Sequence, residues 1–416
     1  IEILERIEAD RRPADRLIEA YTRARRYMGS RDRAAVRALV FGVLRHRARL
    51  DWWCARLDSG QPVGVRSRLL AELVLAQGWD SAAIAEAFAG ARYGPSPLAP
   101  EESALIAALR GKALDHADQP PAVQAELPDW LAHEARDHRP GDRAPPFDLR
   151  VNRRKTNREE VRTLLAGAGI EAAPTPFSPA GLRIAAPVRI EHLPLFRDGL
   201  VEIQDEGSQL VALLMDARPG MTVVDYCAGA GGKTLALVDA MADQGRLVAC
   251  DIDEARLARM AERLARASTS IVETRVLDGA LHREADSLEA DRVLVDAPCS
   301  GSGTWRRHPE AAWRLAPAEL ERYRREQTAI LDRAAALVRP GGRLGYATCS
   351  IFESEGEAQV RAFLAAHPQF ATLAVGDVWR AVLGDNAPDG VGEAMRLRPD
   401  RHGTDGFFLA LLERRA

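Results

Sequence analysis

The alternation of strand-like and helix-like segments after Glu202 constrains the fold of this chain more than any other feature. Short apolar runs alternate with longer segments of helical periodicity, and this order predicts a parallel sheet with helices on both faces. The predicted strands are 222–225, 246–251, 273–277, 292–296, 343–348 and 407–412. The predicted helices are 233–241, 254–267, 317–337 and 355–367. We therefore expect an α/β, Rossmann-like domain that binds its ligand at the carboxyl ends of the strands.

The residues before Glu202 predict two other architectures. Up to about residue 118, apolar side chains such as Val36, Leu39 and Val40 recur at helical spacing without a strand signal, which predicts an all-α bundle. A Pro-rich stretch follows, and then a short strand and an amphipathic helix at 158–166 predict a small α+β module. We expect three domains: an all-α domain at 1–125, a linker and small α+β module at 126–200, and the α/β domain at 201–416.

Composition narrows the class of protein. No run approaches the roughly 18 apolar residues that span a bilayer, and the charged start lacks a signal-peptide core, so we expect a cytoplasmic protein. The five cysteines are scattered without a CxxC pair, which argues against disulfides and a zinc site. The net charge of −3 does not favour nucleic acid. However, residues 23–49 hold nine arginines and one acid, Asp32, which indicates either an RNA-binding face or ordinary solvated helices.

A glycine-rich segment, CAGAGGKT, joins the strand at 222–225 to the next helix. Glycine lets backbone N–H groups approach a ligand closely because it lacks a Cβ atom. A Walker A phosphate loop needs glycine where Cys227 stands, so that spacing fails. A dinucleotide fingerprint needs a third glycine at Thr234, which weakens an NAD site without excluding it. The remaining interpretation is the cofactor loop of a methyltransferase.

Carboxylates follow three successive strands, because Asp225 and Asp251 end the first two and Asp278 follows the third. An acid about twenty residues past the loop is placed to accept hydrogen bonds from both ribose hydroxyls of a nucleoside, which nominates Asp251. Asp278 would then reach the adenine amino group. Each acid alone is more commonly a helix cap, but their shared position at the ligand-binding ends of strands favours a nucleoside cofactor.

Two cysteines follow the next two strands. The strand at 292–296 continues into DAPCSGSGTWRRHPE and the strand at 343–348 into CSIFESEGE, so Cys299 and Cys349 are each followed by serine. A lone buried cysteine usually serves packing. Both of these lie at the predicted ligand-binding edge, so we expect them to take part in chemistry.

Five motifs occur in a fixed order: QDEGSQ (204–209), CAGAGGKT (227–234), DID (251–253), DAPCSGSGTWRRHPE (296–310) and ATCS (347–350). From about residue 147 to the end, they resemble the Sun/Fmu, or RsmB-like, family of S-adenosylmethionine-dependent RNA cytosine-C5 methyltransferases. The front segment, with ARLDWW, is similar to the NusB-like domain of the small-subunit ribosomal RNA branch. Gly229-Ala230 stand where the family commonly has Ala-Pro. The resemblance implies a class I methyltransferase core behind a NusB-like RNA-binding domain and an RNA-binding-like α+β module.

The resemblance also implies roles for individual residues. Cys349 would attack the base, Cys299 would assist breakdown of the covalent adduct, and Asp296 would bond the polar edge of the cytosine. Cytosine-C5 DNA enzymes place the nucleophile after the Pro of the strand-four motif, which would nominate Cys299, but the Thr-Cys-Ser motif favours the RNA arrangement. S-adenosylmethionine would be held by Cys227, Ala228, Gly229, Ala230, Gly231, Gly232, Lys233, Asp251, Asp278 and Asp296.

The implied partner is small-subunit ribosomal RNA presenting an unstacked or single-stranded cytosine, since the ring must leave its stack to react. Trp305 would either stack on a base or anchor its loop, and Arg306, Arg307 and His308 would contact phosphates. We expect a monomer without membrane or metal. The alternatives are a transfer RNA or other RNA substrate, and a non-catalytic RNA-binding ribosome assembly factor.

Overall fold

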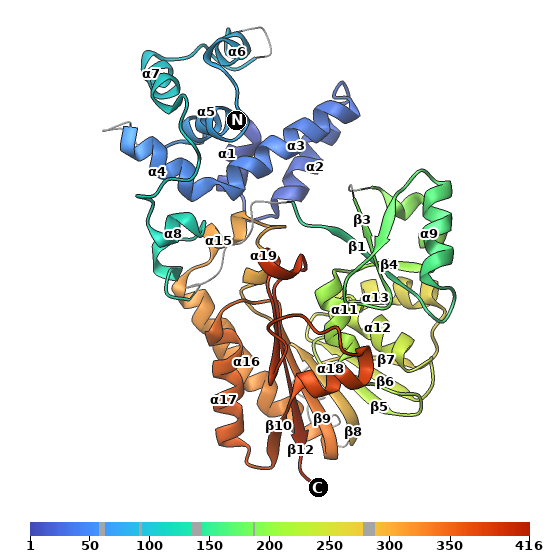
Figure 1. Ribbon diagram of the computed structural model, residues 1–416. Coiled ribbons are helices and arrows are strands. Elements are labelled where there is room, and N and C mark those ends of the chain that lie inside the picture. Colours follow the sequence, from blue (N-terminus) through green and yellow to red (C-terminus); the bar gives the residue numbers. More distant parts are fainter. Residues whose placement is uncertain (58–62, 91–93, 135–143, 186–187, 278–287) are drawn as a thin grey trace. The chain divides into compact units, whose positions relative to one another are not determined.

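The structure is a computed structural model that describes residues 1–57, 63–90, 94–134, 144–185, 188–277 and 288–416 (Figure 1). The chain divides into two compact units. The helical unit comprises residues 1–143 and 305–315, and the sheet unit comprises residues 144–304 and 316–416.

The helical unit is built from amphipathic helices. They are α1 (Glu2–Ala9), α2 (Ala14–Ala24), α3 (Ser30–Arg45), α4 (Arg47–Leu57), α5 (Val65–Leu75), α6 (Ser81–Ala87), α7 (Pro100–Leu109), α8 (Pro121–Gln124) and the 3-10 turn η1 (Asp129–Leu131). In α2, for example, Ala14, Leu17 and Ile18 recur at helical spacing and are buried. The described residues before 135 contain no strand, which confirms the predicted all-α architecture of this segment.

A segment from far along the chain belongs to the helical unit. It contains α15 (Glu310–Arg314), and the predicted boundaries place it in the domain at 201–416. The Glu310 carboxylate accepts from the Ala14 N–H at 2.8 Å. At distances of 2.7 to 3.1 Å, the Arg314 guanidinium donates to the carbonyls of Ile7, Asp10, Arg11 and Arg12. Residues 305–315 are therefore held by the first two helices through backbone groups.

The sheet unit begins with a small antiparallel sheet in the order β2-β3-β1-β4. Its elements are β1 (Phe147–Val151), α9 (Arg158–Gly167), β2 (Ala172–Pro174), β3 (Gly181–Ile184), η2 (Ile190–His192), α10 (Pro194–Arg197) and β4 (Val201–Ile203). Asn157 caps α9 by accepting two N–H groups of its first turn. Val161 and Leu165 of this helix share a core with Leu149 and Leu182 of the sheet. This part of the chain therefore combines an antiparallel sheet with the amphipathic helix α9.

A larger, mainly parallel sheet forms the rest of the sheet unit, in the order β10-β12-β9-β8-β5-β6-β7 with β11 paired to β12. Pairs among β5 to β9 are parallel, whereas β12 is antiparallel to its three neighbours. The strands are β5 (Thr222–Asp225), β6 (Arg246–Asp251), β7 (Val272–Val276), β8 (Ala290–Asp296), β9 (Val338–Thr348), β10 (Phe370–Leu373), β11 (Ala394–Leu397) and β12 (Phe407–Arg414). All six predicted strands are present. The sequence pattern did not predict β10 and β11.

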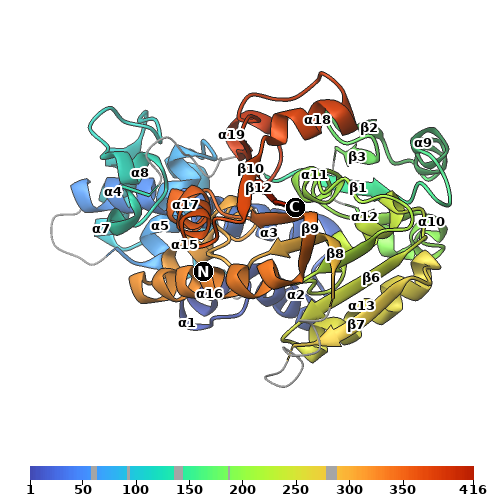
Figure 2. The ribbon, with the colours of Figure 1, turned by 90° about the horizontal axis from the view of Figure 1, so that it is seen from below.

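Helices cover both faces of the large sheet (Figures 1 and 2). They are α11 (Glu206–Leu213), α12 (Gly232–Ala240), α13 (Glu254–Ala267), α16 (Pro317–Leu337), α17 (Glu357–Ala366) and α18 (Val375–Leu383). The sheet unit also contains α19 (Pro399–His402) and the 3-10 turns η3 (Ser302–Thr304) and η4 (Glu353–Glu355). Leu247 and Ala249 of β6 pack with α11, α12, α13 and α18, whereas Val248 and Cys250 pack with α16 and α17. This alternation confirms the predicted α/β architecture, because successive side chains of a strand point to opposite faces.

Candidate active site

Loops after four strands converge at the carboxyl edge of the large sheet. The glycine-rich loop follows β5, Asp251 ends β6, and the loops after β8 and β9 carry Cys299 and Cys349. Since β5 lies between β6 and β8, the strand order reverses at β5. Ligands of open α/β sheets bind at such a reversal. The structure thus brings the glycine-rich loop and both cysteines to one edge.

The glycine-rich loop is shaped for close approach to a ligand. Gly229 and Gly231 have φ angles of 55° and 84°, a left-handed conformation that costs roughly 1–2 kcal/mol in residues with a Cβ atom. A Cβ on Gly231 would also lie 2.5 Å from Cγ of Met260, whereas a Cβ on Gly229 would have no atom within 4 Å. The Gly231 position is therefore crowded by the protein itself, and the Gly229 position is open.

Asp251 holds this loop in place and can still accept hydrogen bonds from a ligand. Its side chain is nearly buried, and its two oxygens accept from the N–H groups of Gly229 at 2.8 Å and Asp253 at 2.9 Å. Each carboxylate oxygen has a second lone pair, so Asp251 can still accept from two hydroxyl groups. These acceptors and the open glycine backbone fit a nucleoside cofactor. Asp278, the other predicted adenosine ligand, lies outside the described residues.

Lys233 and Asp296 form an ion pair between the glycine-rich loop and the end of β8. Lys233 Nζ lies 2.6 Å from Asp296 Oδ2, and Lys233 is 9% exposed. Burial acts to lower the pKa of Lys233, but attraction and hydrogen bonding to Asp296 outweigh it, so the pKa is raised. The neighbouring Thr234 donates to Asp225 Oδ2 at 2.7 Å below the loop. The pair presents a fixed cation and anion at the edge of the sheet.

The two cysteines that the sequence nominated are neighbours. The Sγ atoms of Cys299 and Cys349 are 3.4 Å apart, and both side chains are half-buried. The Gly303 N–H donates to the Cys349 carbonyl at 3.0 Å, which ties the two loops together. The hydrogen bond with Cys349, together with burial, raises the pKa of the Cys299 thiol well above its usual value. The arrangement can present one thiolate and one thiol to the same small ring.

Polar contacts that the sequence analysis did not include also join the cysteine loops. Ser302 Oγ and Ser350 Oγ are 3.0 Å apart, and the buried Glu355 accepts from Ser300 and from Gln327 of α16. The serine after each cysteine was the one sequence signal for this network. Glu355 itself stands in an acidic run, FESEGE, that resembles an exposed turn.

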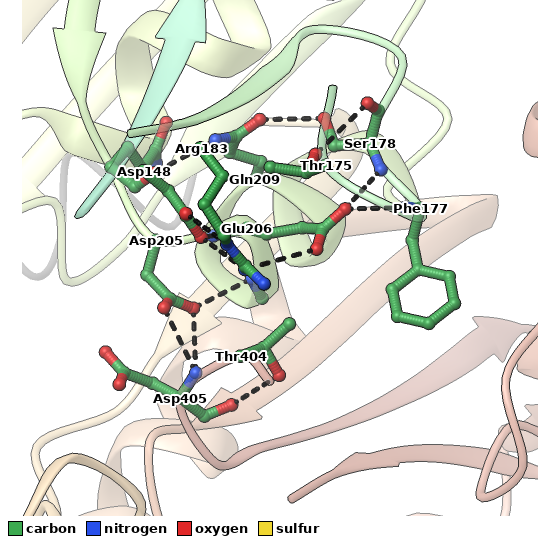
Figure 3. Close-up of polar contacts among 12 residues, drawn as sticks. Asp148, Thr175, Phe177, Ser178, Arg183, Asp205, Glu206, Gln209, Thr404 and Asp405 are labelled. Carbon is green, nitrogen blue, oxygen red and sulfur yellow. Dashed lines mark hydrogen bonds and ion pairs between the residues drawn. The ribbon is translucent and has the colours of Figure 1, made fainter. Parts of the chain in front are cut away.

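The QDEGSQ motif lies at the start of α11 and connects the small sheet to the large one (Figure 3). The buried Glu206 carboxylate accepts from the N–H groups of Phe177 at 2.6 Å and Ser178 at 2.7 Å. Asp205 caps α11 and accepts from the Asp405 N–H at 3.1 Å. Three segments from distant parts of the chain are therefore held together by the side chains of one motif.

The structure also bears on the predictions for Trp305, Cys227 and the arginine-rich segment at 23–49. Trp305 is buried at 2% exposure, which favours the alternative of a loop anchor, and stacking on a base stays a prediction. Burial, as the main cause, raises the pKa of Cys227 well above its usual range, and its role as a cofactor contact stays a prediction. In the arginine-rich segment, Arg49 is buried in an ion pair with Glu126 at 2.6 Å. The exposed members are Arg23, Arg26, Arg31 and Arg37.

The described residues contain no group of three or more His, Cys, Asp or Glu side chains that could hold a metal ion. Across the same residues, no helix combines the length and the apolar character needed to cross a membrane.

Comparisons with known proteins agree with the geometry. Residues 212–413 match the family model for the 16S rRNA methyltransferase RsmB/F, and residues 127–191 match its RsmF/B-like, ferredoxin-like domain. The ribosomal RNA small subunit methyltransferase B of Klebsiella pneumoniae is 31% identical over 93% of this chain and 91% of its own length. The crystal structure of PH0851 has a TM-score of 0.76 at 28% identity, covering 99% of this chain and 97% of that one. A methyltransferase homologue from Pyrococcus horikoshii has a TM-score of 0.56 at 28% identity, covering 70% and 92%.

Proposed function

Because this chain belongs to the RsmB/F family of 16S rRNA methyltransferases, we propose that it transfers a methyl group from S-adenosylmethionine to C5 of a cytosine in small-subunit ribosomal RNA. The observation that carries the proposal is the 3.4 Å separation of the Cys299 and Cys349 sulfurs beside the glycine-rich loop. A covalent route at a pyrimidine carbon needs one sulfur to attack the ring, and a second can assist its release.

The reaction must first activate the base, because C5 of an aromatic pyrimidine is a poor nucleophile. The thiolate of Cys349 adds to C6, which forms a carbon–sulfur bond and makes C5 electron-rich. When bound, S-adenosylmethionine would supply the electrophilic methyl group: C5 would bond to the methyl carbon while the methyl–sulfonium bond breaks, leaving S-adenosylhomocysteine. Water then takes the C5 proton, the C5–H electron pair re-forms the C5–C6 double bond, and the C6–sulfur bond breaks to release Cys349 and restore aromaticity. Cys299 assists this release.

The remaining site residues hold the reactants. Asp296 has a side chain that is 29% exposed, so its carboxylate can accept from the polar edge of the cytosine near N3 and N4 while paired with Lys233. Asp251 and the backbone of the glycine-rich loop would hold the cofactor, together with Asp278. These contacts orient the two reacting carbons in a site where charge develops on the ring.

We assign binding of the RNA to residues 1–125, as a NusB-like domain, and to the small α+β module. The exposed arginines of the helical unit supply cations for phosphates, and residues 127–191 match the family's ferredoxin-like domain. Flipping a paired base costs a few kcal/mol, so a looped or single-stranded cytosine is the favoured substrate. We propose that the protein acts as a cytoplasmic monomer without a metal.

The test incubates the protein with small-subunit ribosomal RNA and tritiated S-adenosylmethionine, and then maps modified cytosines by bisulfite sequencing. The wild type should label the RNA and protect cytosine from conversion, whereas Cys349→Ala should bind the cofactor and transfer nothing. Preferential labelling of transfer RNA would favour the alternative substrate. Binding of RNA without any labelling would favour an assembly factor. Unchanged labelling by Cys349→Ala would refute the proposed nucleophile.

A further inference from the structure

Glu355 has an unusual position for a carboxylate. It follows Cys349 in η4, and its side chain is 0% exposed. Its Oε1 accepts from the Ser300 N–H at 2.9 Å and from Gln327 Nε2 at 3.1 Å, and its Oε2 accepts from Ser300 Oγ at 2.5 Å. A residue of the Cys349 loop therefore holds both the backbone and the side chain of the residue next to Cys299.

Tyr346 and Gln327 make further hydrogen bonds to the backbone around Glu355 and Cys299. The Tyr346 hydroxyl, buried in β9, donates to the Glu355 carbonyl at 2.8 Å. Gln327 also donates to the Pro298 carbonyl at 2.9 Å. The residues before and after Cys299 are thus fixed by one connected network. Movement of the Cys299 sulfur away from Cys349 would break several of these hydrogen bonds.

The hydrogen-bond donors around Glu355 in the described part of the chain are an amide N–H, a side-chain amide and a hydroxyl, all of them neutral. Its negative charge is therefore not cancelled at close range, and interactions between charges are strong where water is excluded. The pKa of Cys299 is raised first by its hydrogen bond to Cys349, then by burial, and further by repulsion from Cys349 and Glu355. By contrast, Cys349 interacts with the cationic Lys233.

We propose that Glu355 is a positioning residue for the reaction, which fixes the Cys299 loop against the Cys349 loop and favours the neutral thiol on Cys299. The inference rests on the proposed function and deepens it, since it names the residue that holds the releasing cysteine in place. Cys299 is then the sulfur that keeps its proton while Cys349 attacks the ring.

Other ionisable groups near Cys299 are consistent with this assignment. Groups that interact with its charge include Cys349, Glu355, Tyr323 of α16 and Tyr346 of β9. Burial raises the pKa of both tyrosines, so they are neutral at physiological pH. Cys349 and Glu355 are therefore the sources of negative charge in this set.

The first test measures Cys299 without requiring activity. The rate of alkylation of Cys299 by iodoacetamide is followed against pH by peptide mass spectrometry in Cys349→Ala and in Cys349→Ala with Glu355→Gln. Glutamine keeps the shape of the side chain but removes its charge, so the alkylation midpoint should move to lower pH. Glu353→Gln in the same background is the matched control, because Glu353 lies in the same turn with its side chain 67% exposed. An unchanged midpoint with Glu355→Gln would overturn the electrostatic part of the proposal.

The second test measures release of the RNA. Single-turnover reactions with ribosomal RNA are run on denaturing gels for the wild type, Glu355→Gln and Glu355→Ala, with cofactor binding as a check of folding. Adduct formation should be nearly unchanged, and adduct breakdown should slow by about tenfold or more in Glu355→Ala. Breakdown at the wild-type rate in folded Glu355→Ala would overturn the positioning role.

If Glu355→Ala does not fold, the rate of adduct breakdown in Glu355→Gln is compared with that of the wild type, and an unchanged rate would overturn the positioning role. If the wild type forms no adduct, the proposed function fails, and the alkylation midpoint still decides the claim about Glu355.

Discussion

Asp225 ends β5 beneath the glycine-rich loop with its side chain fully buried. Burial raises its pKa from 3.8 to about 7, against the opposing hydrogen bond from Thr234 and with repulsion from Asp296 added. Between pH 4 and 7, the folded chain therefore holds a proton on this carboxyl that the unfolded chain releases. The free energy of unfolding should fall as the pH rises through this window, by at most about 4 kcal/mol, and Asp225 should add no further pH dependence at higher pH.

Asp225→Asn tests this pH dependence, because asparagine still accepts from Thr234 but cannot titrate. The stability of the wild type relative to Asp225→Asn should decrease from pH 4 to pH 7 in urea denaturation of the cofactor-free protein. Asp377→Asn, at a site 73% exposed, should follow the wild type. Parallel pH profiles for the wild type and Asp225→Asn would show that this carboxyl does not titrate near neutral pH.

Single residues also show what the sequence could predict of the site. Cys299 and Cys349 could be placed together, because each follows a strand of one parallel sheet and such strands end at a common edge. Glu355 could not, since its burial depends on Ser300 and Gln327, which lie 55 and 28 residues away. The burial of Trp305 could not be predicted from its motif either.

At the scale of elements, the glycine-rich loop gives a sharp prediction. Gly231→Ala adds a Cβ at φ +84° and against Met260, so the loop must shift where it would meet the cofactor. We expect affinity for S-adenosylmethionine to fall by about tenfold, measured by calorimetry, with a stability loss of roughly 1 kcal/mol. Gly220→Ala is the matched control, since Gly220 has φ +87° and open space around it. Wild-type affinity in Gly231→Ala, or equal loss in both variants, would contradict the assignment of this loop.

Prediction of elements succeeded where the local pattern was sufficient. The strands of the parallel core are apolar runs between helices of clear periodicity, so both types could be assigned from sequence. The short strands β10 and β11 have four residues each and pair antiparallel with β12, and β10 Phe370 pairs with Arg414. Their extended conformation depends on a distant partner, and no local periodicity marks them.

At the scale of the whole molecule, residues 305–315 are continuous with the loop that carries Cys299 but belong to the helical unit. The Glu310–Ala14 hydrogen bond joins positions 296 residues apart. A prediction from local periodicity assigns such a segment to its neighbours in sequence. Domain boundaries drawn as single continuous ranges therefore could not capture it.

Arg314→Ala should destabilise the helical unit by about 2 kcal/mol, because four backbone carbonyls lose their donor. Hydrogen exchange should show loss of protection in α1 and α2, with β5 and β6 unchanged. Arg322→Ala is the control, since Arg322 makes a surface pair with Glu326 within α16. Unchanged exchange in α1 with Arg314→Ala would contradict the role given to this contact.

The central claim is that the Cys349 sulfur bonds to C6 of a cytosine while Cys299 serves its release. The most direct measurement incubates Cys299→Ala with ribosomal RNA and S-adenosylmethionine, isolates the adduct that survives denaturation, and maps the linked peptide by mass spectrometry. We predict that the adduct accumulates and that its nucleotide is attached to Cys349. Attachment at any other residue, or no adduct while the variant still methylates the RNA, would contradict the account.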